Sequence, residues 1–507
     1  MGDFLEEFRI RKVRTGSGAT AVQVVRYVNR KCVVVRHIGS GRSVEELAVL
    51  LQEAEIFREE ISCQPSLFGI SSAPVLLHAE HLNLQSVTHH FALNFLRKCF
   101  HACGLEFLPL LYQDFALMRI IEPASKLRTL ELLARYFSFS YSRRTLHRLL
   151  PKFIEQKTEI EAAAYATASK HFSEKFAFVL YDVTTLYFET HKPDDELQAR
   201  GFSKDDKSKQ PQIVVGLLVT LSGFPIRHEI FKGNTFEGHT MLEVVREFQK
   251  IHQDTKPIIV ADAAMLSLEN LEKLAAEGYQ YIVGARLANA PIALIEQISA
   301  ALERSSGASI RLPYPRANYE IVCTYSEKRA RKDRREFEKQ LIKAEQMIAR
   351  KELGKRTKFV KKSANHNDAL ELNEMLKNKT EKLLGIKGYA TNIPDTIMSN
   401  AQIASYYNDL WHVEQSFRMS KSDLKTRPIF HHKHEAIKAH VLLCFVAMII
   451  GKFLELKTNM SIRKIRDTLW NVHEATITDT LTGKNITLQG NLTEFKNSKL
   501  AKINLSH

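Results

Sequence analysis

One stretch near the carboxyl end of the sequence places a carboxylate among cations and aromatic rings. Residues 406–428 read Y-Y-N-D-L-W-H-V-E-Q-S-F-R-M-S-K-S-D-L-K-T-R-P, with no Gly or Pro before Pro428. Ser405 can cap the start, so this stretch predicts one amphipathic helix of about six turns. At 3.6 residues per turn, one stripe of that helix carries Tyr407, Trp411, Glu414, Arg418 and Lys421. Such a stripe suits a metal ligand beside a site for phosphates and bases, although a Glu-Arg pair four residues apart can also be a plain surface contact.

Two aspartates upstream follow apolar runs that predict strands. Asp182 lies in Y-D-V-T-T-L-Y-F-E and Asp262 lies in I-I-V-A-D-A-A-M-L-S, each where a strand is expected to end. Together with Glu414 they give three acids in three separated blocks. In this order the blocks resemble the DDE transposases of bacterial insertion sequences, which have a ribonuclease-H-like catalytic core.

The resemblance implies a metal-dependent reaction at these acids. Transfer of a phosphodiester needs activation of a water or a 3'-hydroxyl and stabilisation of the leaving oxygen, which two divalent ions about 4 Å apart can provide. Mg²⁺, with Mn²⁺ as the alternative, takes oxygen ligands, and clustered carboxylates would repel one another without the metal charge. Asp182, Asp262 and Glu414 are therefore the expected catalytic residues and metal ligands.

The last predicted helix carries most of a signature found in one group of these enzymes. That signature places Tyr, Arg, Glu and Lys at fixed spacing (YREK); Tyr407, Glu414 and Lys421 match it, while Leu410 stands in place of the Arg. The branch that the chain most resembles, the insertion-sequence family numbered 1634, shares this departure and continues R-P-I-F-H, as this chain does. The residues expected to contact DNA are Tyr407, Trp411, Arg418, Lys421 and Arg427. Burial of Trp411 in the core is the alternative to stacking on a base.

Three details bear on this site. Arg418, one helical turn after Glu414, is the expected substitute for the missing Arg. Ala264 stands where Gly is expected, and its methyl group would strain the turn if that residue needed positive φ. The histidines at 431, 432, 434 and 440 lack the cysteines or the tight helical HxxxH spacing of zinc sites. Phosphate contact or packing is their expected role, with a zinc site as the alternative.

Length and composition favour several domains and a polyanionic partner. The chain has 507 residues, 44% of them hydrophobic, and should divide into three or four domains. Lys and Arg exceed Asp and Glu by 72 to 57, and the net charge of +15 favours nucleic acid. The six cysteines form no CxxC pair, which indicates a reducing, cytoplasmic compartment. No signal peptide is expected, and the apolar run 441–450 is too short to span a bilayer, so we expect a buried helix and no membrane partner.

The elements that must position the acids follow from the hydrophobic pattern. Residues 10–39 predict a basic hairpin that turns near Asn29, and Ser43 predicts a helix start. Residues 82–174 predict helices, whose basic residues (Arg143, Arg144 and Arg148) either contact DNA or lie on a solvated face. From residue 175, the predicted order is three antiparallel strands, a helix, a strand, helices and a strand. This pattern alone predicts a mixed α/β sheet, and the resemblance adds the ribonuclease-H-like fold.

Residues 287–386 interrupt this order, at the place where similar transposases carry an insertion domain. Within them, 319–325 predict a strand, and 326–362 predict a helical tract with fifteen Lys or Arg against six Asp or Glu. The tract is either a solvated helix or a contact surface for the DNA backbone. The predicted domains are 1–60, a basic hairpin and helix; 61–174, helical and DNA-binding; 175–286 with 387–457, the catalytic core; 287–386, the insertion; and 458–507, a carboxyl-terminal helix and hairpin.

DNA transposition is the function that the resemblance implies. Such an enzyme cleaves the ends of its insertion sequence and transfers the 3'-hydroxyl strands to target DNA. Its partners are double-stranded DNA, as terminal inverted repeats and as target, and a second copy of the chain, since coordinated cutting of two ends implies at least a homodimer on DNA. Two alternatives stay open: a decayed or domesticated transposase that only binds DNA, and a ribonuclease-H-like nuclease without strand transfer.

Overall fold

Contacts within the chain separate it into two compact units, each assembled from distant parts of the sequence. The computed structural model describes residues 8–28, 31–61, 79–174, 176–190, 196–202, 209–253, 256–265, 267–350, 358–362, 370–490 and 492–503. The first unit comprises Met1–Phe95, Leu130–Ser140 and Arg466–Lys502, and the second comprises Leu96–Thr129, Tyr141–Ile465 and Ile503–His507. Three helices contribute residues to both units: α2 (His90–Ala102), α4 (Lys126–Phe137) and α15 (Ile462–Trp470).

In the first unit, the basic amino-terminal segment forms a three-stranded antiparallel sheet, which confirms the two strands of the predicted hairpin and adds a third strand that was not predicted. Its strands are β1 (Phe8–Arg14), β2 (Thr20–Val28) and β3 (Lys31–Gly41), with β2 in the middle. The turn predicted at Asn29 lies outside the described residues. The Ser43 hydroxyl accepts a hydrogen bond from the Glu46 amide and caps α1 (Val44–Ile61), as predicted. Helix α1 packs its apolar side on Val22 and Val24 of the sheet.

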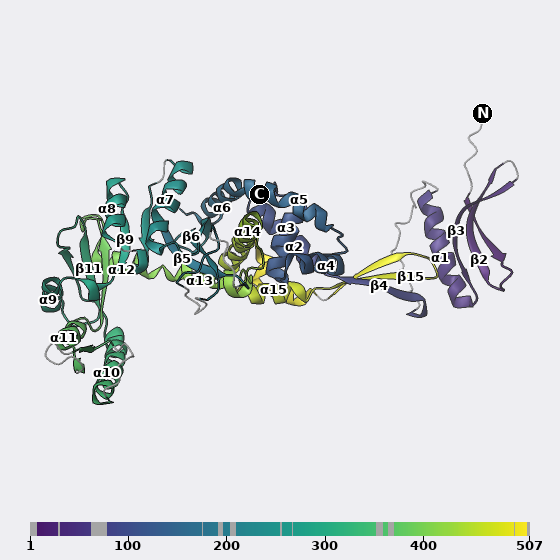
Figure 1. Ribbon diagram of the computed structural model, residues 1–507. Coiled ribbons are helices and arrows are strands. Elements are labelled where there is room, and N and C mark those ends of the chain that lie inside the picture. The colour runs from purple at the N-terminus through teal and green to yellow at the C-terminus, as the bar shows by residue number, and fades with distance from the viewer. Residues whose placement is uncertain are drawn as a thin grey trace. The chain divides into compact units, whose positions relative to one another are not determined.

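A second sheet of the first unit joins segments that are far apart in the sequence (Figure 1). Its order is β16 (Asn485–Gln489), β15 (Glu474–Asp479) and β4 (Leu82–Thr88), and α16 (Thr493–Asn497) follows. The predicted carboxyl-terminal hairpin is confirmed. The helix predicted from residue 82 is wrong for β4, which pairs antiparallel with β15. The stretch L-N-L-Q-S-V-T has no helical repeat, and nothing in its local pattern identifies a partner so distant in the sequence.

The second unit is built on one mixed sheet of eight strands (Figure 1). Its order is β10 (Ser309–Pro313), β11 (Glu320–Tyr325), β14 (Ile386–Thr391), β9 (Tyr281–Ala285), β8 (Ile258–Ala261), β5 (Phe178–Tyr187), β6 (Gln212–Val219) and β7 (Pro225–Lys232). The predicted antiparallel meander is β5, β6 and β7, whereas β5, β8 and β9 are parallel. Parallel neighbours need crossover connections, which α7 (Thr240–Ile251) and α8 (Leu268–Ala276) provide. The predicted mixed α/β sheet is thus confirmed.

The apolar run near residue 450 belongs to the core helix of the second unit. This helix, α14 (His434–Thr458), contacts α3 (Leu110–Ile121), α5 (Arg143–Glu155) and β7, and α6 (Lys157–Phe172) also packs on β7. By length and composition alone α14 could cross a membrane, but 94% of its apolar window is buried inside the protein. The prediction of a buried helix is therefore confirmed.

Residues 287–386 are divided between the central sheet and a small core of their own. Strands β10 and β11 extend the sheet beyond β14, so the first part of the expected insertion belongs to the central sheet. The other elements are α9 (Ile292–Ala301), α10 (Glu327–Arg350), α11 (Glu374–Lys382) and the paired strands β12 (Val360–Lys362) and β13 (Leu370–Leu372). The helix predicted over 326–362 is confirmed for α10 and wrong for β12, which is held by its cross-strand pairing with β13.

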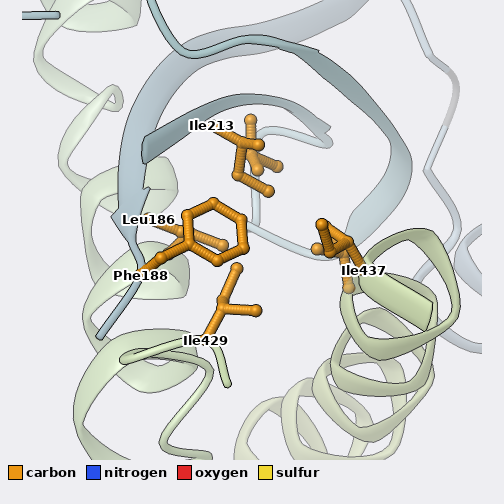
Figure 2. Close-up of a cluster of buried hydrophobic side chains, with 7 residues drawn as sticks. Leu186, Phe188, Ile213, Ile429 and Ile437 are labelled. Carbon is orange, nitrogen blue, oxygen red and sulfur yellow. The ribbon is translucent and has the colours of Figure 1, made fainter. Parts of the chain in front are cut away.

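A cluster of buried side chains fixes the R-P-I-F-H segment to β5 (Figure 2). The cluster consists of Leu186, Phe188, Ile213, Val215, Ile429, Ile437 and Val441. Ile429 forms a parallel bridge with Phe188, and its amide donates a hydrogen bond to the Tyr187 carbonyl at 2.9 Å. This segment therefore lies beside the strand that carries Asp182.

Candidate active site

Asp182 and Asp262 lie on neighbouring strands, at the point where the parallel pairing of those strands ends. Tyr181 on β5 is paired with Ala261 on β8, and each aspartate is the next residue along the chain. The prediction that Asp262 directly follows a strand is confirmed. The prediction that Asp182 ends a strand is wrong, because antiparallel pairing with β6 carries β5 on to Tyr187. What ends at Asp182 is the pairing with β8.

The last helical stretch begins earlier than predicted. Helix α12 (Asn400–Asn408) is capped by Ser399, whose hydroxyl accepts from the Gln402 amide while the Gln402 side chain accepts from the Ser399 amide. This reciprocal capping box satisfies two amides that a helix start leaves unpaired. Ser405, the predicted cap, therefore lies inside the helix.

The same stretch is also divided, so the single helix predicted as far as residue 428 is wrong. A two-residue turn separates α12 from α13 (Trp411–Arg418), and one π-helical turn follows (η5, Met419–Asp423). The helix cannot continue because Lys425 has a left-handed φ of 47° and because a proline disfavours helical backbone at the residue before it, here Arg427.

Despite this division, the predicted stripe and both aspartates line one cavity. The cavity has a volume of about 610 Å³. Its lining includes the three acids, Asp182, Asp262 and Glu414, and the five predicted DNA contacts, Tyr407, Trp411, Arg418, Lys421 and Arg427. The structure therefore brings every predicted site residue to one place, while their chemical roles stay predictions.

Tyr407 contacts Asp262 directly. Its ring is buried, and its hydroxyl donates a hydrogen bond to Asp262 Oδ1 at 2.9 Å. Burial and the negative charge of Asp262 raise the pKa of Tyr407, so the hydroxyl keeps its proton and remains a donor. Gly284 on β9 permits this contact, because a Cβ there would overlap the Tyr407 hydroxyl.

Three of the side chains that α13 presents to the cavity are exposed, whereas Val413 and Phe417 are buried. Glu414 and Arg418 are both exposed, and Trp411 is 52% exposed. The Trp411 ring lies against the His412 ring, with centroids 3.7 Å apart. Burial of Trp411 in the core is therefore excluded, and its ring lies at the wall of the cavity.

Lys387 is a cavity residue that the sequence analysis did not single out. It lies on β14, half-buried, with Nζ 4.5 Å from the centroid of the Tyr407 ring. Burial and the charge of Arg329 lower the pKa of Lys387, while Asp262 and Glu414 act in the opposite direction. The available signal was a lone Lys inside the apolar strand G-I-K-G-Y-A-T, where the neighbouring positions are buried.

The structure shows the surroundings of Leu410 and Ala264, the two residues that depart from the transposase motifs. Leu410, which stands in place of the signature Arg, is buried and carries no charge. Ala264 lies in a short 3₁₀ turn (η3, Ala263–Met265) and is not among the described residues with positive φ. The strain considered for its methyl group is therefore absent at this position.

Carboxylate oxygens are the donors that this cavity offers to a metal ion. Asp182 Oδ1 accepts the Val183 amide hydrogen at 2.8 Å and Asp262 Oδ1 accepts from Tyr407, so hydrogen bonds orient two of the three carboxylates. Within the described part of the chain, no three His, Cys, Asp or Glu side chains lie close enough to hold one ion together. The donor set nevertheless fits Mg²⁺ or Mn²⁺, which take oxygen ligands, better than zinc, which favours nitrogen and sulfur.

The four histidines of the R-P-I-F-H region lie in different surroundings. His440 is buried on α14 and donates from Nε2 to the Thr426 carbonyl at 2.9 Å. His431 accepts a hydrogen bond from Lys126 at 2.7 Å. His434 lies 3.3 Å from Glu196, and His432 is exposed. His431 thus contacts Lys126, and His440 contacts Arg119 and the Thr426 carbonyl, while the two rings pack edge to face with centroids 5.3 Å apart.

The range that contains this cavity also matches a known family. A family model described as "Transposase DDE domain" matches residues 175–450, more than half of the chain. A search of curated proteins gives no significant match. The matched range begins three residues before β5, ends within α14 and includes all three acids of the cavity. The family implies a DNA-binding nuclease or transferase that uses divalent metal ions. The chain therefore belongs to the transposase DDE domain family.

Proposed function

We propose that this protein is a DNA transposase that cleaves the ends of its own insertion sequence and joins the 3'-hydroxyl strands to target DNA. The proposal rests on the cavity of about 610 Å³ to which β5, β8 and α13 bring Asp182, Asp262 and Glu414. Four basic side chains line the same cavity: Lys387, Arg418, Lys421 and Arg427. Acids and cations in one cavity suit a phosphodiester that is held partly by metal ions and partly by direct contacts.

The three acids would hold two divalent ions, Mg²⁺ or Mn²⁺. When bound, such ions activate a water or a 3'-hydroxyl and stabilise the leaving oxygen. The protein's part is to orient the ligands, since loss of a partner that holds a ligand in place typically costs about 10- to 100-fold in metal affinity or activity. Tyr407 does this for Asp262, and the Val183 amide does it for Asp182.

Lys387 takes the place of the cation that the signature puts at position 410. Leu410 cannot contact a phosphate by charge, whereas Lys387 lies beside Tyr407 and experiences the charges of Asp262 and Glu414. Arg418, one turn after Glu414, contributes a second cation from the helix side. We assign Lys387 to the scissile phosphate and Arg418 with Lys421 to neighbouring phosphates.

The same proposal assigns the finer class of the enzyme. Three antiparallel strands followed by parallel strands with helical crossovers support a ribonuclease-H-like core. Leu410 and the R-P-I-F-H segment support membership of the insertion-sequence family numbered 1634. Cutting of two ends in one reaction requires two copies of the site, so we propose a homodimer on the terminal inverted repeats.

Amide substitution of the three acids tests this function. Asp182→Asn, Asp262→Asn and Glu414→Gln keep the size of each side chain but remove its charge. Each variant should lower cleavage of labelled element ends in Mg²⁺ or Mn²⁺ by about a hundredfold or more, because bound ions contribute several kcal/mol at the transition state. End binding, measured without metal, should persist.

The exposed acids Asp395 and Glu435 lie outside this cavity and provide matched controls. Asp395→Asn and Glu435→Gln should cleave like the wild-type protein. A joining assay with a labelled 3'-hydroxyl end separates strand transfer from simple hydrolysis. A wild-type protein that binds ends but cleaves none in either metal would favour the DNA-binding alternative, and near-normal cleavage by any acid variant would remove that acid from the proposed ligands.

A further inference from the structure

A second cavity brings together two segments that are far apart in the sequence. It has a volume of about 170 Å³. One wall comes from M-R-I-I-E-P-A-S-K-L at 118–127, and the other comes from R-P-I-F-H and α14. We call this cavity the cationic pocket. Six basic side chains line it: Arg119, Lys126, Lys425, Arg427, His431 and His440.

Two cations of this pocket, Arg119 and Lys126, are buried and form no ion pair with a carboxylate in the described part of the chain. Arg119 is 7% exposed and Lys126 is 8% exposed. Arg119 donates to the Leu424 and Lys425 carbonyls and to His440, and Lys126 donates to His431. No Asp or Glu lines the cavity, and no ion pair joins Arg119 or Lys126 to a carboxylate in the described ranges. Buried Lys and Arg are ordinarily paired, so this arrangement lacks an anion.

The pKa values of the basic side chains in this pocket agree with the lack of a nearby anion. Burial and the nearby Arg119 lower the pKa of Lys126 to about 7. Burial, together with Lys126 and Arg119, lowers the pKa of His431 to about 3, and the pKa of His440 also lies well below its usual value. Both rings are therefore neutral near pH 7, and an anion in the cavity would favour the charged form of Lys126.

The pocket adjoins the catalytic cavity, and its rim carries an aromatic ring. Arg427 lines both cavities. Ile429 is fixed beside β5, so the residues on either side of it are held near the strand that carries Asp182. Phe430, also in the pocket lining, is 63% exposed. A phosphate subsite with an exposed ring beside it matches the alternation of phosphates and bases in a nucleic acid strand.

We propose that the cationic pocket binds a backbone phosphate of the DNA strand that passes through the catalytic cavity, with Phe430 against the adjoining base or sugar. Cations that contact phosphates position a strand without reading its sequence. The pocket would thus set how far the strand advances past the three acids. This inference rests on the proposed function for its choice of DNA as the phosphate source.

Inorganic phosphate probes the pocket without DNA. Thermal melting of the full-length protein is compared in phosphate and in chloride at equal ionic strength. Phosphate should raise the melting temperature of the wild-type protein, because a ligand that binds only the folded state stabilises it. Lys126→Met should lose this response and Lys126→Arg should keep it. Lys170→Met, which removes an exposed lysine outside the cavity, should respond like the wild type. An equal phosphate response in Lys126→Met overturns the proposal.

DNA binding then identifies the source of the phosphate. Affinity for a labelled duplex end is measured over a range of salt without divalent metal. Lys126→Met should weaken binding roughly tenfold and lower the slope of log affinity against log salt by about one. Lys170→Met should change neither value. Phe430→Ala, at an exposed position, should weaken DNA binding while leaving the phosphate response and the melting temperature intact.

The outcomes separate this inference from the proposed function. Loss of the phosphate response with unchanged DNA binding would mean that the pocket holds only a free anion, which overturns the DNA assignment. Binding that depends on Lys126, in a protein that cleaves no DNA, would support the pocket and overturn the catalytic proposal. Cleavage and binding that are both independent of Lys126 and Phe430 would overturn the pocket and leave the catalytic proposal standing.

Discussion

Lys387 enters the catalytic cavity from a strand, whereas the signature of the last helix would place a cation at position 410. Strand β14 puts Lys387 and Tyr389 on one face, and both contact the Tyr407 ring. The Tyr407 hydroxyl in turn donates a hydrogen bond to Asp262. Lys387 thus contacts Tyr407, and Tyr407 contacts Asp262, although the three residues come from different parts of the sequence. Substitution of one of them should therefore affect the other two.

Lys387→Gln should therefore lower cleavage of element ends by roughly a hundredfold, the cost of a misplaced scissile bond. Its melting temperature should stay near that of the wild type, because burial already disfavours the charged form of this lysine. Lys387→Arg should recover much of the rate. Lys343→Gln, at an exposed lysine of α10, is the matched control. Equal cleavage by Lys387→Gln and Lys343→Gln would exclude Lys387 from the site.

Tyr407→Phe tests the orientation of Asp262. It removes the hydroxyl and keeps the ring, so the metal concentration for half-maximal cleavage should rise about 10- to 100-fold, as for other partners of metal ligands. A titration with Mn²⁺ measures this. Tyr406→Phe changes the neighbouring tyrosine, which stacks on Phe178 and lies outside the cavity, and should leave the titration unchanged. An unshifted Tyr407→Phe curve would show that Asp262 needs no such support.

Elements with a strong local signal were predictable from the sequence, and elements defined by a distant partner were not. The apolar runs of β5, β6 and β8 have partners nearby and were predicted. Strand β4 is held by β15, far along the chain, and was predicted as helix. The stripe on α12 and α13 was predictable because seven-residue spacing survives the short turn between them. Lys387 and the cationic pocket depend on tertiary contacts between separated segments, which no single pattern contains.

At the level of the helix face, the Trp411 side chain on α13 should contribute to DNA binding and little to the stability of the fold. Because the ring is 52% exposed, Trp411→Ala should change the melting temperature little. Loss of stacking on a base should weaken binding to element ends by about 1 to 3 kcal/mol. Fluorescence anisotropy and thermal melting on the same sample check both parts. A clear drop in melting temperature with normal DNA affinity would assign Trp411 to packing instead.

On the scale of the whole molecule, both units contain buried or partly buried histidines that are neutral near pH 7. In the first unit, His89 is stacked on Trp470 with ring centroids 3.7 Å apart, and burial and the charge of His473 lower the pKa of His89 to about 4. In the second unit, the pKa of His431 is lowered to about 3 by burial and by Lys126 and Arg119. Unfolding returns both rings to the ordinary pKa near 6.5.

Stability should therefore fall as the pH drops from 6.5 toward 4. In this window the unfolded chain binds protons at His89 and His431 that the folded chain does not bind, so acid favours unfolding. Melting curves between pH 7.5 and 4.5 check this. His431→Gln should reduce the change of melting temperature with pH in the second unit. His89→Gln should reduce the same change in the first unit. A melting temperature that is constant or rises between pH 7 and 5 would contradict the burial of neutral rings.

Strands β11 and β14 are antiparallel neighbours in which Tyr325 is directly paired with Ile386. Everything from 326 to 385, including α10 and α11, is therefore the connecting loop of one oversized β-hairpin. Its two ends lie only about 5 Å apart, the spacing of adjacent strands. Lys387 follows immediately after the loop, so hairpin register fixes its place whatever the loop contains, and the entropic cost of lengthening a loop grows slowly. Such a loop can be enlarged, trimmed or replaced during evolution without moving the acids, which is how the third acid can stand 152 residues after the second and still line the same cavity.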